Sequence, residues 1–213
     1  MKKHLTAFFL LLFIIPCLAE EVTFYINDDQ KRDVVTFTSK APLETVKGRT
    51  GEVKGFVTFD PQDIMGTAKG GFEVDLASLK TGIGLRDKQM REQYLETDKY
   101  PSVVFKLTKV IQASSNTLAD NQAVDLVLEG QFKLHGITRD IQVPIAVKYM
   151  KATEETKKLR PGDLLRITAD FDVLLSDYNI QRPQFVILKL DDTQKISIDL
   201  MGSTELPPVA LAE

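Results

Sequence analysis

The fold is decided by the stretch Arg166-Ile167-Thr168-Ala169-Asp170-Phe171-Asp172-Val173, in which polar and apolar residues alternate at every position. A β-strand turns successive side chains to opposite faces, so this stretch predicts a strand with one buried face and one wet face. The same alternation runs through residues 71–76, 124–129, 141–147 and 195–200. One-sided strands of this kind are typical of antiparallel sheets, because buried parallel strands tend to be apolar on both faces.

Further strands are predicted between these rows, and residues that favour turns separate them. Many strands joined by short links indicate a barrel or a sandwich. No internal repeat or long linker divides the chain, so we expect one domain over residues 20–202 and a flexible tail over 203–213, where Pro207-Pro208 lies. The additional strands are Val22–Ile26, Val34–Thr38, Val53–Phe59, Val103–Ile111 and Phe185–Leu190, and the turn signals are Asn27–Asp29, Asp60-Pro61, Lys69–Gly71, His135-Gly136, Arg160–Asp163 and Asp191-Asp192.

One segment departs from the alternation. Residues 85–95 read Leu-Arg-Asp-Lys-Gln-Met-Arg-Glu-Gln-Tyr-Leu and are rich in helix formers. Met90 and Tyr94 are four residues apart and would share a helix face, where we interpret them as packing residues. We therefore predict a short helix around residues 85–95 that lies across a barrel end or seam.

The first residues have the order of a secretory signal peptide. Lys2 and Lys3 precede an uncharged apolar run over residues 5–15, and small residues then permit cleavage after Ala19. This run of 11 residues is shorter than the roughly 20 that a membrane-spanning helix needs. A lipid-modified Cys17 is the weaker alternative, because Pro16 stands where lipoprotein signals have a small residue. We expect a periplasmic or secreted protein with no cysteine and no transmembrane segment after cleavage.

The charge balance is mildly acidic. The chain holds 27 basic and 30 acidic residues, and removal of residues 1–19 changes the net charge from −3 to −5. Nucleic acid is not expected as a partner, because phosphate binding depends on lysine and arginine. Direct adhesion to anionic lipid headgroups is disfavoured on the same grounds.

Residues for catalysis or metal binding are sparse. His135 would be the lone histidine after cleavage, whereas a zinc site usually needs three or four ligands. A Ser-His-acid triad would need His135 as its base, and no Gly-x-Ser-x-Gly turn is present. Gly82-Ile83-Gly84 lacks the remaining spacing of a dinucleotide-binding loop. Neither an enzyme nor a metal site is predicted. Arg86 and Asp87 have two open interpretations, a cap at the start of the helix or a charged group at a cavity mouth.

Several stretches together resemble the YceI-like family: residues 51–60, 72–82, 85–87 and 98–106, then 130–139 and 176–180. The similarity spans roughly Val34 to Leu200, although Asn179 stands where the family commonly has glycine. The resemblance implies a single extended, lipocalin-like antiparallel β-barrel that is exported to the bacterial periplasm or beyond. It also implies a central tunnel that encloses a polyisoprenoid chain, such as an isoprenoid quinone.

We therefore expect a non-enzymatic protein that binds, carries or stores a long apolar lipid, with no required cofactor. The alternative is an envelope scaffold whose core is filled and whose loop Lys151–Asp163, which carries Glu154, Glu155, Lys157, Lys158 and Arg160, binds a protein. Sheet edges could also pair two copies as a homodimer. The candidates for the apolar cavity are Phe56, Phe72, Val74, Leu76, Phe105, Leu107, Leu128, Phe132, Phe171 and Val173, and those for its mouth are Arg86, Asp87, Tyr94 and Tyr100.

Overall fold

The computed structural model describes residues 20–182 and 190–205. The predicted signal peptide, residues 185–189 of the predicted strand Phe185–Leu190 and residues 206–213 of the predicted tail lie outside the described residues. The described residues form ten strands, in the order β1 Val22–Asn27, β2 Val34–Lys40, β3 Thr45–Thr50, β4 Val53–Phe59, β5 Lys69–Asp75, β6 Ser102–Ala113, β7 Ala123–Leu134, β8 Ile137–Met150, β9 Leu164–Leu174 and β10 Thr193–Ser203.

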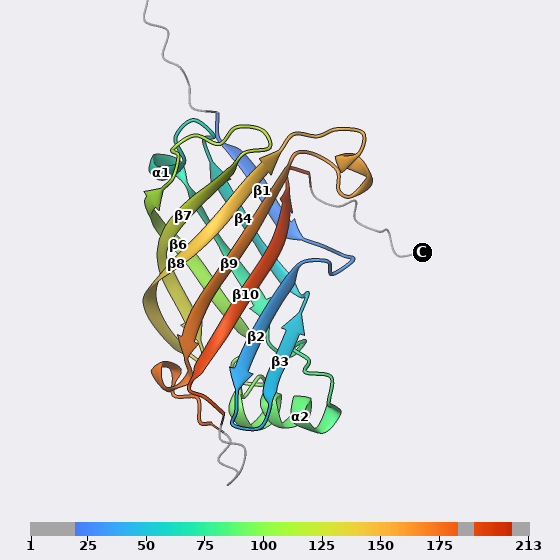
Figure 1. The fold of residues 1–213 in the computed structure, drawn as a ribbon, viewed down its shortest axis with the longest axis vertical. Coiled ribbons are helices and arrows are strands. Elements are labelled where there is room, and N and C mark those ends of the chain that lie inside the picture. Colours follow the sequence, from blue (N-terminus) through green and yellow to red (C-terminus); the bar gives the residue numbers. More distant parts are fainter. Residues whose placement is uncertain (1–19, 183–189, 206–213) are drawn as a thin grey trace, which may run out of the picture.

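Eight of these strands form a closed antiparallel barrel, which confirms the predicted fold (Figure 1). Neighbours follow the order β1-β4-β5-β6-β7-β8-β9-β10, and β1 pairs with β10 to close the wall. The hairpin β2–β3 continues the sheet beyond β10 along the lower part of the barrel. No helix among the described residues is long and apolar enough to cross a membrane.

Strand β10 shares one edge between two partners. Residues 194–199 pair with β2, whereas Ser203 pairs with Tyr25 of β1. Between these pairings, the backbone N–H of Met201 donates to Asp33 Oδ1 at 2.8 Å, and Arg160 donates to the Met201 carbonyl oxygen. Asp33 and Arg160 thus satisfy the backbone N–H and carbonyl of Met201, which lies between the part of β10 that pairs with β2 and the part that pairs with β1.

Arg160 is the centre of a buried ion cluster at this point. Its Nη2 lies 2.9 Å from Asp33 Oδ1 and 3.1 Å from Asp28 Oδ2. The side chains of Arg160, Asp28 and Asp33 are only 8%, 5% and 1% exposed. The expectation that Arg160 belongs to an exposed loop surface is therefore wrong, because the loop turns this residue back into the wall.

The apolar rows point into the barrel, as the alternation predicts. In β7, Val124, Leu126 and Leu128 are buried and Asp125 is exposed. The row in β9 behaves in the same way, with Ile167, Ala169 and Val173 buried. The buried residues of neighbouring strands join into one core along the inside of the wall.

Two turn signals have opposite outcomes. His135 and Gly136 have φ of 51° and 78° and form the tight turn between β7 and β8. Lys69-Gly70-Gly71, in contrast, lies within β5 and is not a turn. The glycines there let strands approach, because a Cβ on Gly71 would lie 2.8 Å from the Phe105 carbonyl oxygen and one on Gly70 would lie 2.3 Å from that of Phe56.

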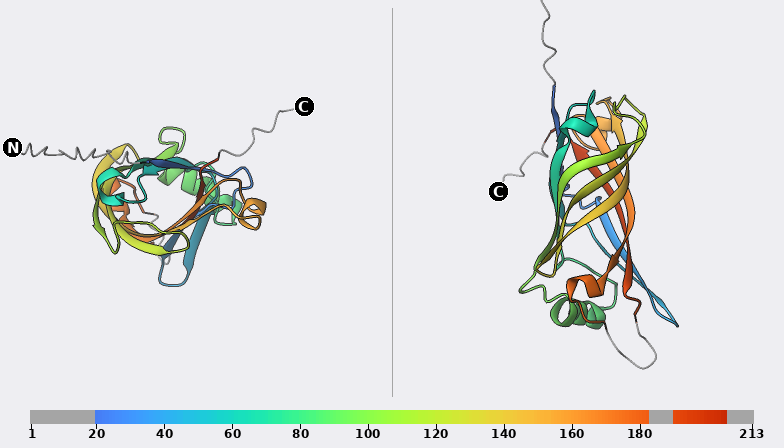
Figure 2. Two further views of the ribbon diagram at one scale, coloured as in Figure 1. Left: turned by 90° about the horizontal axis from the view of Figure 1, so that it is seen from above. Right: turned by 90° about the vertical axis from the view of Figure 1, so that its left-hand side faces the viewer.

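Short helices lie at the two ends of the barrel. The predicted helix around residues 85–95 is present as α2 (Gly84–Gln89), which runs directly into the π-helix η1 (Met90–Tyr94). Both views of the ribbon place α2 at the same end as the tip of the β2–β3 hairpin (Figures 1 and 2). The remaining elements are α1 Ile64–Thr67 at the opposite end and the 3-10 turns η2 Thr156–Lys158 and η3 Leu175–Tyr178.

Candidate ligand-binding cavity

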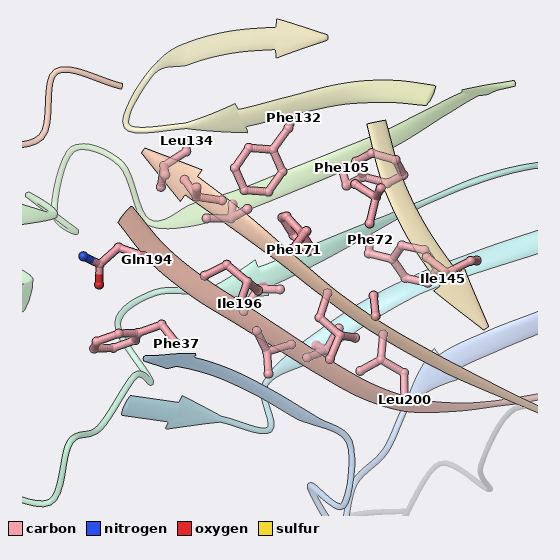
Figure 3. A pocket seen from close by; sticks show the side chains of 18 of the residues that line it. Phe37, Phe72, Phe105, Phe132, Leu134, Ile145, Phe171, Gln194, Ile196 and Leu200 are labelled. Atoms are coloured by element: carbon pink, nitrogen blue, oxygen red, sulfur yellow. The ribbon is translucent and has the colours of Figure 1, made fainter. Parts of the chain in front are cut away.

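A cavity of about 440 Å³ runs through the inside of the barrel, between α1 at one end and α2 with the β2–β3 hairpin at the other. This volume lies in the range of small-molecule sites, about 300–1,000 Å³. Figure 3 shows that Phe72, Phe105, Phe132 and Phe171 point into it from four different strands. Among the described residues that line it, only Glu44 and Arg86 are charged. The walls therefore offer apolar contact over nearly their whole length.

Nine of the ten predicted apolar side chains border this cavity. Aromatic rings hold part of the lining in place: the Phe132 and Phe171 rings lie edge to face at 6.2 Å, and Tyr178 packs on Phe132 at 5.7 Å. The nine are Phe72, Val74, Leu76, Phe105, Leu107, Leu128, Phe132, Phe171 and Val173.

Phe56 is the exception, because its side chain points out of the barrel and is 47% exposed. In β4 the inward positions are Val53, Gly55, Val57 and Phe59, so Phe56 shares its face with Lys54. Gly55 leaves the inside free for a neighbour, since a Cβ there would lie 2.7 Å from the Phe72 ring. The prediction of Phe56 as a lining residue is wrong.

The structure adds lining residues that were not singled out. Ile145, Ile196 and Leu200 belong to rows whose alternation already indicates inward side chains (Figure 3). Phe37 of β2 lies near the lower end, and its ring fits only because Gly48 of the adjacent β3 has no side chain: a Cβ there would lie 2.2 Å from the ring. Phe37 lies in the predicted strand Val34–Thr38, which is the feature of the sequence that points to it. The neighbouring strand β3 is mostly polar, and its sequence does not indicate a strand.

At the α1 end the cavity is covered by apolar residues. Ile64 and Leu118 line it and are only 3% and 4% exposed. Two backbone hydrogen bonds hold this cover: Ile64 N–H donates to the Asn116 carbonyl at 3.0 Å, and Leu118 N–H donates to the Pro61 carbonyl at 2.9 Å. The polar residues of the lining gather at the opposite end.

That opposite end is the cavity mouth, and an ion pair spans it. Arg86 of α2 lies 3.5 Å from Glu44 in the β2–β3 hairpin, through Nη1 and Oε2. Arg86 Nε also donates to Thr81 Oγ1 at 2.8 Å, and Gln194 contributes an amide from β10. These groups could hydrogen-bond a polar headgroup while the interior holds an apolar chain.

The four predicted mouth residues separate into two pairs. Arg86 and Tyr94 line the cavity, whereas Asp87 and Tyr100 do not. Asp87 is buried and accepts hydrogen bonds from the backbone N–H and the hydroxyl of Thr81, at 2.7 and 2.5 Å. Burial alone would raise the pKa of Asp87, but the Thr81 hydrogen bonds and the nearby Arg91 and Arg86 charges outweigh it and lower the pKa.

Asp87 therefore fixes the loop before α2 and thereby orients Arg86. Its carboxylate does not hydrogen-bond the helix N-terminus as a side-chain cap, because Ile83 occupies the cap position. Tyr100 instead packs on the His135 ring at 4.4 Å between ring centres. Both residues support the end of the barrel from outside the cavity.

Comparisons with known proteins agree with this architecture. The chain matches the model of the YceI-like domain over residues 26–201. Similar folds occur in BcnA of Burkholderia cenocepacia, with 17% identity, a TM-score of 0.64 and coverage of 82% of this chain and 99% of that one. A polyisoprenoid binding domain from Saccharophagus degradans has 15% identity, a TM-score of 0.62 and coverage of 86% and 99%.

A third similar structure, the YCEI protein of Campylobacter jejuni, has 17% identity and a TM-score of 0.59, with coverage of 76% of this chain and 87% of that one. At these identities the solved structures support the fold alone. A comparison with curated proteins gives no match. The family model covers most of the chain and nearly the whole barrel, and the chain therefore belongs to the YceI-like domain family.

Proposed function

We propose that this protein binds one long apolar lipid of the polyisoprenoid type inside its barrel and carries or stores it without catalysis. The observation that carries this proposal is the apolar cavity, which is covered at the α1 end and whose polar lining, within the described part of the chain, lies at its mouth. The proposal is supported by the family membership and by the polyisoprenoid binding domain with a similar fold.

The cavity predicts how affinity depends on ligand length. Drug-sized ligands gain about 0.3 kcal/mol per non-hydrogen atom, so each five-carbon isoprene unit contributes roughly 1.5 kcal/mol. This corresponds to about a tenfold tighter Kd for each added unit. The gain ends when further units no longer fit. A saturated alkyl chain of equal carbon number should follow the same trend, because burial of apolar surface provides the affinity.

We further propose that residues 1–19 are removed on export and that the protein acts in the bacterial periplasm or is secreted. The order of charged, apolar and small residues over this segment supports the proposal. The intact mass of the protein from the extracytoplasmic fraction should match a chain that starts at Glu20. A mass that contains residues 1–19, or a lipid on Cys17, would contradict it.

The decisive test is to purify the protein from the extracytoplasmic fraction of its native host, extract it with organic solvent and analyse the extract by mass spectrometry. One prenyl lipid per protein molecule is the expected result, and it would also identify the headgroup. An empty extract from protein that also fails to take up added prenyl alcohols would reject the lipid-binding function.

A further inference from the structure

The rim of the cavity mouth combines exposed apolar side chains with an excess of positive charge. The rim is defined here as residues 40–49, around the tip of the β2–β3 hairpin, and residues 80–94, which include α2 and η1. Two views place the hairpin tip and α2 at the same end of the barrel (Figures 1 and 2). The Glu44–Arg86 ion pair joins the two halves of the rim.

Three large apolar side chains of the rim face solvent. Leu43 at the hairpin tip is 71% exposed, and Leu85 and Ile83 at the start of α2 are 69% and 53% exposed. Leu43 and Leu85 are the most exposed large apolar side chains of the described chain. They directly precede Glu44 and Arg86, which line the cavity, so the exposed apolar surface is continuous with the mouth.

The charge of the rim is opposite to that of the whole chain. Residues 40–49 and 80–94 hold seven basic and three acidic residues, a net charge of +4, whereas the whole chain has a net charge of −3. Of the three acids, Glu44 is paired with Arg86 and Asp87 is buried. The exposed basic residues of the rim are Lys40, Lys47, Arg49, Lys80 and Lys88.

Acidic residues at the same end of the barrel lie at the end of β5 (Asp75), directly after η1 (Glu96 and Asp98), around η3 and at the start of β10, and Glu96 contacts His135 at 2.8 Å. Asp177 is paired with Arg139 at 3.4 Å, and Asp192 accepts a hydrogen bond from Ser176 and lies 3.6 Å from Arg182. In Figure 1 the hairpin tip and α2 extend further from the barrel than η3 does. A flat negative surface at this end would therefore meet the basic rim before it met η3.

We infer that this rim docks the protein on an anionic lipid bilayer, with the cavity mouth facing the membrane. Leu43, Ile83 and Leu85 would enter the acyl boundary while the lysines contact phosphate headgroups, the combination that holds peripheral proteins on membranes. The bilayer is then the source or destination of the lipid that the proposed function requires. The negative net charge of the whole chain disfavours such adhesion, but it is a sum over all residues and does not reflect the positive charge concentrated at the rim.

The inference is tested by flotation of the purified protein with vesicles of phosphatidylglycerol and phosphatidylcholine in equal parts, and with vesicles of phosphatidylcholine alone. Binding is expected to the anionic vesicles and to weaken with added salt. Leu43→Asp with Leu85→Asp should reduce the partition coefficient by roughly tenfold or more for each leucine. Lys40→Glu with Lys88→Glu should reduce it by about fivefold for each unit of charge changed.

Matched controls are available at the opposite end of the barrel. Leu159 is 60% exposed in the β8–β9 loop, and Lys157 and Lys158 are exposed beside it. Leu159→Asp, and Lys157→Glu with Lys158→Glu, should leave vesicle binding unchanged. Equal losses in the control and rim variants would show a general charge effect and overturn the inference.

Uptake of a radiolabelled prenyl alcohol in vesicle-free buffer separates this inference from the proposed function. Rim variants that still take up the alcohol but no longer float with anionic vesicles would support docking. Wild-type protein that takes up the alcohol but does not bind anionic vesicles would overturn docking and leave lipid binding intact. Failure to take up the alcohol would instead count against the proposed function.

Discussion

Replacement of Arg160 by methionine should destabilise the protein by about 3–5 kcal/mol at pH 7, the usual cost when one partner of a buried ion pair is removed. Methionine retains much of the apolar volume, so the loss reports charge and hydrogen bonding. The Arg160 guanidinium lies 2.9 Å from Asp33 and 3.1 Å from Asp28, which Arg32 also contacts at 2.9 Å, and it donates to the Met201 carbonyl. The loss would be a large part of a typical folding free energy of about 5–15 kcal/mol.

The pH dependence of this loss has a definite sign. Burial already raises the pKa of Asp33, and loss of the guanidinium should raise it further in the folded variant, whereas the Arg32 hydrogen bonds continue to lower the pKa of Asp28. A raised pKa means that the folded state takes up protons at a higher pH than the unfolded state, where Asp titrates near about 3.9. The variant should therefore regain part of its stability as the pH falls from 7 toward 5, and the gap to wild type should narrow.

The assay is urea denaturation of both proteins, followed by circular dichroism at pH 7 and at pH 5. Lys158→Met is the matched control, because Lys158 is exposed in the same loop and should change stability by less than about 0.5 kcal/mol. A loss below about 1 kcal/mol for the Arg160 variant at pH 7, or a gap that widens toward pH 5, would refute the buried-cluster reasoning.

Three further predictions concern the cavity, its mouth and acid stability. Phe72→Asp should abolish uptake of prenyl alcohols while the protein still unfolds cooperatively. Phe56→Asp, on the outer face of the adjacent strand, should leave uptake unchanged. Loss of uptake in both variants would contradict the assigned faces. Glu44→Gln should speed both entry and release of the lipid in stopped-flow measurements. It should change stability by less than about 1 kcal/mol, because the ion pair with Arg86 is partly exposed. Unchanged rates would show that the pair does not restrict the mouth. Burial opposes ionisation of Asp28, but hydrogen bonds from Arg32 and the Arg160 charge lower its pKa to about 2. The ionised carboxylate therefore contributes up to about 2 kcal/mol to folding stability at neutral pH, and this contribution is lost as the pH falls from about 4 to 2. The acid unfolding of Asp28→Asn should lack this component.

The fold could be predicted well because alternation reports directly on burial. The rows in β7 and β9 specify both a strand and its inward face, and the structure places them accordingly. Phe56 shows the limit of residue type as a guide. It is apolar and aromatic, but Val53 and Val57 occupy the inward positions of the alternation in β4, so Phe56 lies on the outer face.

Features that depend on contacts between distant segments could not be predicted. Lys69-Gly70-Gly71 has the composition of a turn, and only the backbone of the neighbouring strands shows why glycine is needed within β5. Arg160 lies in a charged loop, and its burial follows from Asp28 and Asp33, more than 120 residues earlier in the chain. The strand β3 was not predicted, because its sequence Thr-Val-Lys-Gly-Arg-Thr has Val46 as its lone large apolar residue.

The pairing of β1 with β10 has a consequence for how the chain folds as it is made. Tyr25 belongs to the first strand and Ser203 to the last, so the wall cannot close until nearly all of the barrel has been synthesised. Until then, the inner faces of the earlier strands stay accessible, and such incomplete sheets are prone to aggregation. The many contacts between distant residues also favour slow folding. A partner that shields the growing chain, or one that keeps it unfolded until it is complete, would therefore benefit this protein more than it would a helical bundle of equal length.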